Sequence, residues 1–208
     1  MNNPNVFWCY VVAAWSGFYV MVVELLSARL IAPYFGSSVQ VWGSVIFVFM
    51  LGLAIGYLLG GLYSRRDPGL RKLCAILALA ALSTLPTVLF GNQVLEAILA
   101  MADPTQAVDP RLSIFACFGM YFVPAVFSGM VSPYAIRLIV ADRQSSGRSA
   151  GYLYFVSTVG SSAGTLMTSF YFVIWAEVNT ILLSAIGVSL AVAALAALVG
   201  RNKESAPS

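Results

Sequence analysis

Histidine is absent from this chain of 208 residues. That absence removes the side chain that most often shuttles protons or binds metal ions near neutral pH. Charged residues are scarce as well, at 9% of the sequence, against roughly 25% in a typical soluble domain. So few charges cannot cover a water-facing surface, whereas 60% of the residues are hydrophobic and the mean hydropathy is +0.89. The sequence therefore predicts a membrane protein, and we expect neither a cofactor nor a bound metal.

Catalytic signatures are also missing. The cysteines Cys9, Cys74 and Cys117 stand singly in apolar stretches and form no Cys-x-x-Cys pair, so burial as small hydrophobes is favoured over thiol–disulfide chemistry. No pair of carboxylates falls on one helical face as general acid–base catalysis would need. We therefore predict no catalytic residue and no enzyme activity, and the small net charge of +3 gives no reason to expect a nucleic-acid partner.

Long apolar runs dominate what is present. A membrane-spanning helix needs about 20 apolar residues, and six segments qualify, at about 6–27, 39–63, 73–91, 112–136, 150–175 and 178–200. The first run lacks the basic start and small-residue cleavage site of a signal peptide, so we expect it to be retained. Residues 92–101 show helical spacing and predict a short amphipathic surface helix. The chain is expected to be one six-helix domain over 1–208, with 201–208 as a disordered tail.

The connecting segments differ in charge. Nine cations fall on one side of the predicted spans, namely Arg65, Arg66, Arg71, Lys72, Arg137, Arg143, Arg148, Arg201 and Lys203. The other side has only two cations, Arg29 and Arg111, together with several carboxylates. Because basic segments stay in the cytoplasm, we predict a multi-pass protein of a bacterial-type inner (plasma) membrane with both termini cytoplasmic.

A segment of the chain recurs 108 positions further along without gaps. Twelve positions match across the 35 residues 29–63, including Arg29 with Arg137, Gly52 with Gly160 and Gly56 with Gly164. Three spans separate the copies, so the two copies cross in opposite directions. The predicted fold is an all-α membrane protein with six transmembrane helices in a 3+3 inverted repeat. Its halves are about 1–100 and 101–200, and it resembles half of a major-facilitator transporter.

Small residues recur four apart on the second and fifth spans, at Gly52, Gly56, Gly60, Gly160 and Gly164. Such a smooth face lets another helix backbone approach closely in lipid. Packing inside the chain is one interpretation. The other is a subunit interface or a sliding contact, which keeps a homodimer open as a prediction.

Ionisable and aromatic residues near the first repeat copy are candidates for substrate binding. Glu24 is the only carboxylate within the first span, where it would face a partner, a cavity or a cationic ligand, unless the helix ends early and Glu24 lies among the headgroups. Arg29 and its repeat counterpart Arg137 are further candidates, although Arg29 could equally extend toward lipid phosphates. Tyr34 and Trp42 could stack on a cation or belong to the interfacial aromatic belt.

The segment around these residues resembles a known family. Five residues occur in the order typical of the membrane half of transmembrane spermidine-synthase-like proteins, namely Glu24, Arg29, Pro33, Gly36 and Trp42. The glycine-rich segments 52–61 and 151–165 are similar to that family too. The chain departs from the family at Ser157 and at Ser64–Arg66, and it contains no Gly-x-Gly-x-Gly segment for the soluble synthase half.

Two hypotheses of function follow. The duplication, Glu24 and the polyamine-linked resemblance favour a transporter, or transporter subunit, for a small solute such as a polyamine or related amine. The alternative is a non-transporting membrane scaffold or subunit that docks a partner membrane or soluble protein, such as a separate synthase-like enzyme.

Overall fold

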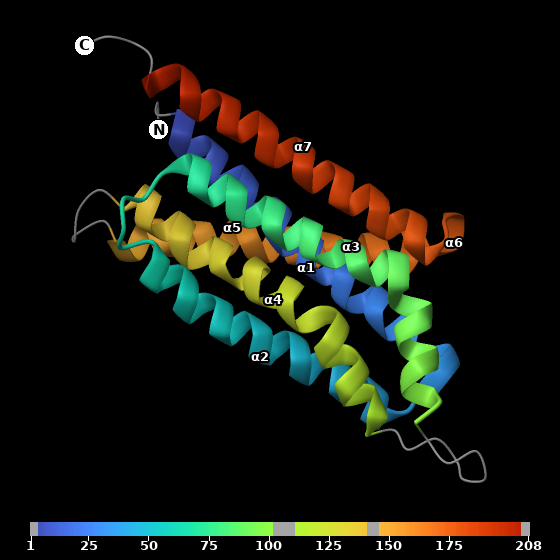
Figure 1. The fold of residues 1–208 in the computed structure, drawn as a ribbon. Coiled ribbons are helices and arrows are strands. Elements are labelled where there is room, and N and C mark those ends of the chain that lie inside the picture. Colours follow the sequence, from blue (N-terminus) through green and yellow to red (C-terminus); the bar gives the residue numbers. More distant parts are fainter. Residues whose placement is uncertain (1–3, 102–110, 141–145, 205–208) are drawn as a thin grey trace.

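The computed structural model describes residues 4–101, 111–140 and 146–204, and the regular structure in these ranges is helical (Figure 1). In chain order the elements are α1 (Pro4–Phe35), α2 (Val39–Tyr63), α3 (Leu70–Leu99), α4 (Leu112–Ile139), α5 (Ser146–Met167), the π-helix η1 (Thr168–Phe172), α6 (Val173–Trp175) and α7 (Val178–Glu204). Five of them, α1, α2, α3, α4 and α7, are long and apolar enough to cross a membrane. The prediction of an all-α protein is confirmed, and this composition is compatible with a multi-pass membrane protein.

The predicted fifth span is less apolar than the others. Residues 146–175 form consecutive helical elements, because α5 passes into η1 and then α6. α5 is not among the helices whose length and composition suit a membrane, since serine and glycine recur along its length. Polar and small residues therefore occur within the predicted fifth span, 150–175, which was expected to be apolar.

Several helices extend beyond the predicted boundaries. α1 continues past residue 27 to Phe35, so Glu24 lies well inside the helix rather than beyond its end. α3 includes the segment predicted as a separate surface helix, and it changes direction part-way along (Figure 1); Pro86, which removes a backbone donor, lies within it. α7 continues to Glu204, so part of the expected tail is helical, while 205–208 lie outside the described residues.

The turn between α1 and α2 depends on two residues. Gly36 adopts a positive φ of 80° and its N–H donates to the Ala32 carbonyl at 2.8 Å. This left-handed conformation ends α1 without the steric cost that a side chain would add. Ser38 then begins α2 as its N-cap, because its Oγ accepts from the Val41 N–H at 3.4 Å. The short turn keeps α1 and α2 adjacent and antiparallel.

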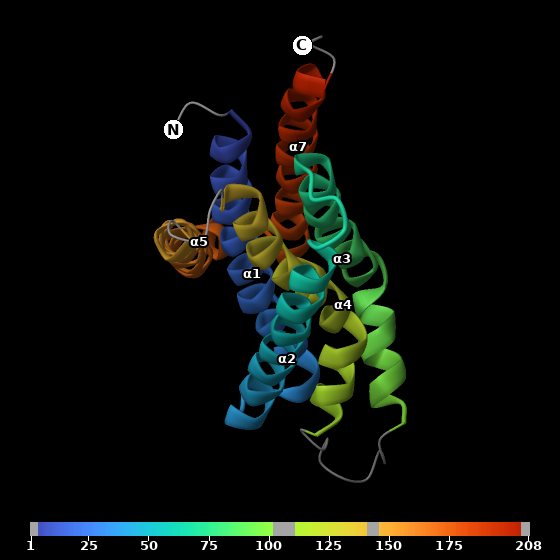
Figure 2. The same ribbon diagram turned by 90° about the vertical axis from the view of Figure 1, so that its left-hand side faces the viewer.

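α1 and α4 form the centre of the bundle. α2 packs along α4, α5 packs along α1, and α3 and α7 pack against each other and against this central pair. Figure 2 shows α5 at the edge of the bundle, where it crosses the view almost end-on while the other long helices run lengthwise. α1 begins and α7 ends at the same end of the bundle (Figure 1).

The buried apolar residues form two clusters that lie in succession along α1 and α4. One cluster takes in Tyr19 to Phe35 of α1 and Ala116 to Ala125 of α4. The other takes in residues 9–13 of α1 and residues 131–135 of α4. Between the two clusters, α1 carries Ser16 and Gly17 and α4 carries Ser128 and Gly129. This gap at mid-height is where the candidate site lies.

Hydrogen bonds between side chains and neighbouring helices tie the bundle together. The Tyr19 hydroxyl donates to Thr84 Oγ1 at 2.7 Å, which links α1 to α3. Thr87 donates to the Met120 carbonyl at 3.0 Å, and Trp15 Nε1 donates to Ser189 Oγ at 2.8 Å. In lipid such bonds add to packing, because no water competes for the same donors.

Glycines set the closest helix approaches. Gly52, Gly56 and Gly60 of α2 are buried, and a Cβ at any of them would meet α4, for example Gly129 Cα at 2.8 Å from Gly56. Gly160 and Gly164 of α5 lie in the same way against the backbone of α1, at Ala14 and Phe18. All five glycines predicted to form a smooth face therefore pack within the chain.

The ends of the bundle differ in charge. The end at which α1 begins also carries the connection from α2 to α3, the last turn of α4 and the start of α5 (Figure 1). The cations at this end include Arg65, Arg66, Arg71, Lys72, Arg137 and Arg148. Arg143 lies outside the described residues. The opposite end carries Arg29 and Arg111 with Glu96 and Glu177.

Candidate functional site

A small polar cavity lies in the gap between the two apolar clusters. Its volume is about 100 Å3, and it is lined by residues of four helices: Ser16, Gly17, Val20 and Met21 of α1, Leu53 and Tyr57 of α2, Ser128 and Ser132 of α4, and Ser157 and Ser161 of α5. A water molecule needs about 10–15 Å3 of such volume and two or more polar partners. This serine cavity therefore has both the size and the chemistry to hold several waters or a small polar ligand.

The hydroxyls of the serine cavity are available for a ligand. Elsewhere in the chain, helical hydroxyls donate to carbonyls of their own helix, as Ser44, Ser83 and Ser189 do at 2.7–2.9 Å. Over the described ranges, none of the five serine hydroxyls forms a hydrogen bond within the protein, although Ser16 and Ser128 are only 4% and 6% exposed. These hydroxyls face the cavity, so water or a solute inside it can serve as their hydrogen-bond partner.

Close packing of α1 on α5 forms one wall of the cavity. A Cβ at Gly17 would lie 2.8 Å from Ser161 Oγ and 3.1 Å from Ser157 Oγ, and it would also meet the Ser157 carbonyl. Only glycine allows this approach, which holds both serine side chains over α1. Ser157 and Ser161 are one turn apart, as are Ser128 and Ser132 on α4, so each pair lies on one helical face.

Glu24 lies near the cavity but outside its lining. It follows Val20 by four residues, and residues four apart share a helical face, so Glu24 is one turn beyond the cavity on α1. It is half-buried, and within the described part of the chain no cation pairs with it.

The other predicted binding residues do not gather at this cavity. Arg29 is exposed near the end of α1 and lines a shallow groove of about 390 Å3 with Trp175 and Glu177. Tyr34 packs partly against the apolar cluster, and Trp42 is 43% exposed on the first turn of α2. Arg137 lies on the last turn of α4, at the opposite end of the bundle. The five residues therefore do not form one site.

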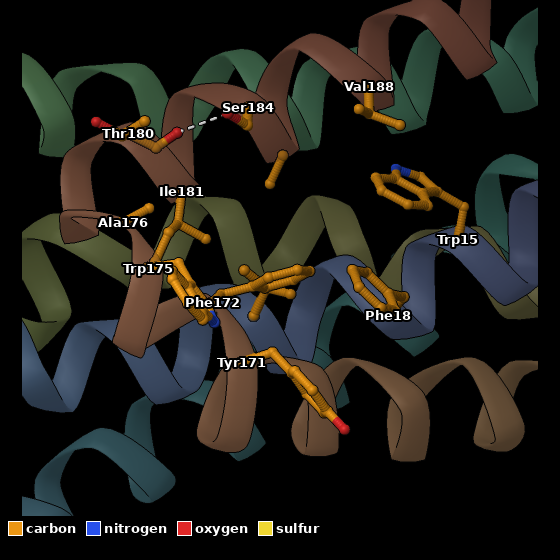
Figure 3. Close-up of a pocket in the computed structure, with 12 residues that line it drawn as sticks. Trp15, Phe18, Tyr171, Phe172, Trp175, Ala176, Thr180, Ile181, Ser184 and Val188 are labelled. Carbon is orange, nitrogen blue, oxygen red and sulfur yellow. Dashed lines mark hydrogen bonds between the residues drawn. The ribbon is translucent and has the colours of Figure 1, made fainter.

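A larger apolar depression lies between α1 and α7. This aromatic groove has a volume of about 590 Å3, and Figure 3 shows Trp15, Phe18, Phe172 and Trp175 along one side of it, with residues of α7 along the other. Trp15 and Phe18 stack with ring centroids 5.1 Å apart. No charged residue lines the groove, so it suits hydrocarbon better than a polar solute.

The sequence contains one signal for the serine cavity, which is the spacing of its serines. Serine recurs at a spacing of four in two of the predicted spans, at 128 and 132 and at 157 and 161. Spacing alone cannot identify such a site, because a serine in a membrane helix usually bonds to its own backbone. Only the fold shows that these hydroxyls meet around a shared space.

No family model, curated protein or solved structure matches this chain. The described residues also contain no group of histidine, cysteine, aspartate and glutamate able to hold a metal ion. Any functional assignment therefore depends on the geometry of the site itself.

Proposed function

We propose that this protein is a membrane transporter, or one subunit of a transporter, for a small polar solute that binds in the serine cavity. The observation that carries this proposal is the meeting of unpartnered hydroxyls from α1, α4 and α5 at mid-height in the bundle. Solute sites of transporters lie near the bilayer midplane, where repeated halves meet. Unsatisfied polar groups are otherwise avoided at that depth.

The proposed architecture is the 3+3 inverted repeat, with α1–α3 and α4–α7 as its halves. Two pairs of contacts support it. A Cβ at Gly56 would meet the Val126 carbonyl, and a Cβ at Gly164 would meet the Phe18 carbonyl. Adding 108 to 56 gives 164, and subtracting 108 from 126 gives 18, so one contact maps onto the other. Gly52 with Phe122 and Gly160 with Ala14 correspond in the same way. A pseudo-two-fold axis in the membrane plane would produce these pairs.

The proposed orientation follows from charge. The end of the bundle that carries Arg65, Arg66, Arg71, Lys72, Arg137 and Arg148 is assigned to the cytoplasm. Both termini would then lie on the cytoplasmic side of a bacterial-type inner membrane.

The proposed substrate class is a polyamine or related amine. Glu24 supplies the negative charge, and the repeat relation places Ser132 as its counterpart on α4, since 24 plus 108 is 132. An amine could donate to the serine hydroxyls while its charge faces Glu24. The resemblance of residues 24–43 to spermidine-synthase-like membrane domains points to the same class of solute.

α5 is the element that we propose moves during transport. It packs mainly on α1, through Gly160, Gly164 and Gly17, and glycine contacts can slide with little steric resistance. The π-helix η1 follows α5, and π-turns in helices are frequent at functional positions. Movement of α5 would open the cavity wall formed by Ser157 and Ser161.

Uptake into proteoliposomes tests this proposal. Radiolabelled putrescine and spermidine would be offered to liposomes containing the protein, the Ser128→Ala/Ser161→Ala variant, or Glu24→Gln. We expect uptake by the parent protein and at least a tenfold loss in both variants. Ser83→Ala is the matched control, because that hydroxyl bonds to its own helix. Uptake of no amine, or equal uptake by all variants, contradicts the amine proposal.

One observation favours the alternative of a docking subunit. The exposed face of α5 and η1 includes the polar residues Thr158, Ser162 and Ser169, which are poorly suited to lipid. A second copy, or a membrane or soluble partner such as a synthase-like enzyme, could cover that face. Purification in mild detergent with mass determination separates the cases: a stoichiometric foreign partner favours the scaffold, and a homodimer that takes up solute favours transport.

A further inference from the structure

A third depression lies at the basic end of the bundle, between α2 and α4. This α2/α4 groove has a volume of about 620 Å3. Its walls are apolar, formed by Leu59 and Leu62 of α2 and by Phe127 and Met130 of α4. The α2 residues span one helical face, with Tyr63 next to them. The groove therefore presents hydrocarbon-binding walls that run along the helices.

Two arginines stand at the open end of the groove. Arg65 and Arg66 follow Ser64, the C-cap of α2; both are exposed and line the same depression. Within the described residues neither has an acidic partner. The neighbouring carboxylate of Asp67 pairs with Lys72 at 3.3 Å, and Lys72 also donates to the Asp67 carbonyl at 2.7 Å. The charge of both guanidinium groups thus remains available to an external anion.

We propose that the α2/α4 groove binds an anionic phospholipid of the surrounding leaflet. Its phosphate lies between Arg65 and Arg66, and one acyl chain lies along Leu59, Leu62, Phe127 and Met130. Guanidinium groups recognise phosphate through paired hydrogen bonds, and basic pockets between membrane helices are suited to anionic headgroups.

The arrangement of charge and apolar surface favours a lipid over a free anion. From Leu59 to its last residue Tyr63, α2 rises roughly 6 Å, so the apolar walls lead away from the arginines along the bundle. A free phosphate would use only the two arginines and would leave these walls uncovered. A lipid uses both parts at once, with its headgroup at the membrane surface.

Native mass spectrometry on the full chain in a neutral detergent tests the proposal. The protein would be titrated with phosphatidylglycerol, with phosphatidylcholine of the same chains, and with glycerol phosphate alone. We expect one tightly bound phosphatidylglycerol, and we expect its affinity to fall roughly 10- to 30-fold in Arg65→Gln/Arg66→Gln. Arg148→Gln is the matched control, because it removes a charge at the same end of the bundle but outside the groove, where Arg148 lies over Tyr152.

Three outcomes would overturn the proposal. The first is unchanged phosphatidylglycerol affinity in the double variant. The second is an equal loss in Arg148→Gln, which would indicate a diffuse electrostatic effect. The third is glycerol phosphate binding as tightly as the lipid, which would mean that the arginines hold a free anion. Each result is independent of solute uptake, so the lipid site and the transport proposal can fail separately.

Discussion

At the scale of single residues, glycine and serine have complementary roles in this bundle. Glycines remove side chains where two helix backbones come together, as Gly56 does against Gly129. Serines lie next to these close contacts, and Ser128 and Ser161 line a cavity between the helices. In a chain with so few charges, glycines determine where helices pack closely, and serines supply the polar groups of the proposed binding site.

The glycine contacts predict a contrast along α2. Gly56→Ala should destabilise the protein by roughly 1–3 kcal/mol, because its Cβ would overlap the α4 backbone. Gly61→Ala should be neutral or slightly stabilising, since nothing lies within 4 Å of a Cβ at that position and alanine favours helix. Thermal unfolding in detergent, followed by size-exclusion chromatography, measures both. Equal melting temperatures for the two variants would contradict the close α2–α4 approach.

At the scale of helices, much of the chain could be predicted from its sequence, because lipid imposes a simple rule. Spans about 20 residues long must be apolar and helical, and α2 begins and ends at the predicted residues. The ends of α1 and α3 were predicted too early, since Glu24 and the polar pair Asn92 and Gln93 interrupt the apolar pattern without ending the helix. The serine cavity was missed, because its residues come from four helices whose mutual packing no local pattern encodes.

The helix pair α1 and α3 offers a second prediction. Thr84→Val removes the acceptor of the buried Tyr19 hydroxyl, and Tyr19→Phe removes the donor. We expect each single variant to lose about 0.5–2 kcal/mol of stability, and a double-mutant cycle to give a coupling near 0.6 kcal/mol. Chemical or thermal unfolding in one detergent measures all four proteins. Additive effects would show that the bond contributes nothing to α1–α3 packing.

At the scale of the whole molecule, we propose a bundle with a basic end in the cytoplasm and a polar site at mid-height. Over the described residues the regular structure is helical, and five helices are long and apolar enough to cross a membrane. The inverted repeat and the sidedness remain predictions, supported by paired glycine contacts at a constant offset and by the distribution of arginines.

Sidedness can be measured with introduced cysteines. Ser37→Cys, in the turn between α1 and α2, should react with a membrane-impermeant maleimide in intact cells. Arg66→Cys, after α2, should react only once the membrane is permeabilised. The native cysteines are buried, so we expect the parent protein to give little background. The reverse pattern would contradict the assigned orientation, and labelling of both sites in intact cells would contradict a membrane crossing by α2.

The most direct test of the central claim is the accessibility of the serine cavity to water and solute. Ser128→Cys would be placed in liposomes and treated with a small water-soluble methanethiosulfonate reagent, with the buried native Cys117 as the internal control. The account predicts that the residue-128 thiol reacts, that Cys117 does not, and that a transported amine slows the reaction. A thiol at residue 128 as unreactive as Cys117, in a protein that remains folded, would contradict a solute site at the centre of this bundle.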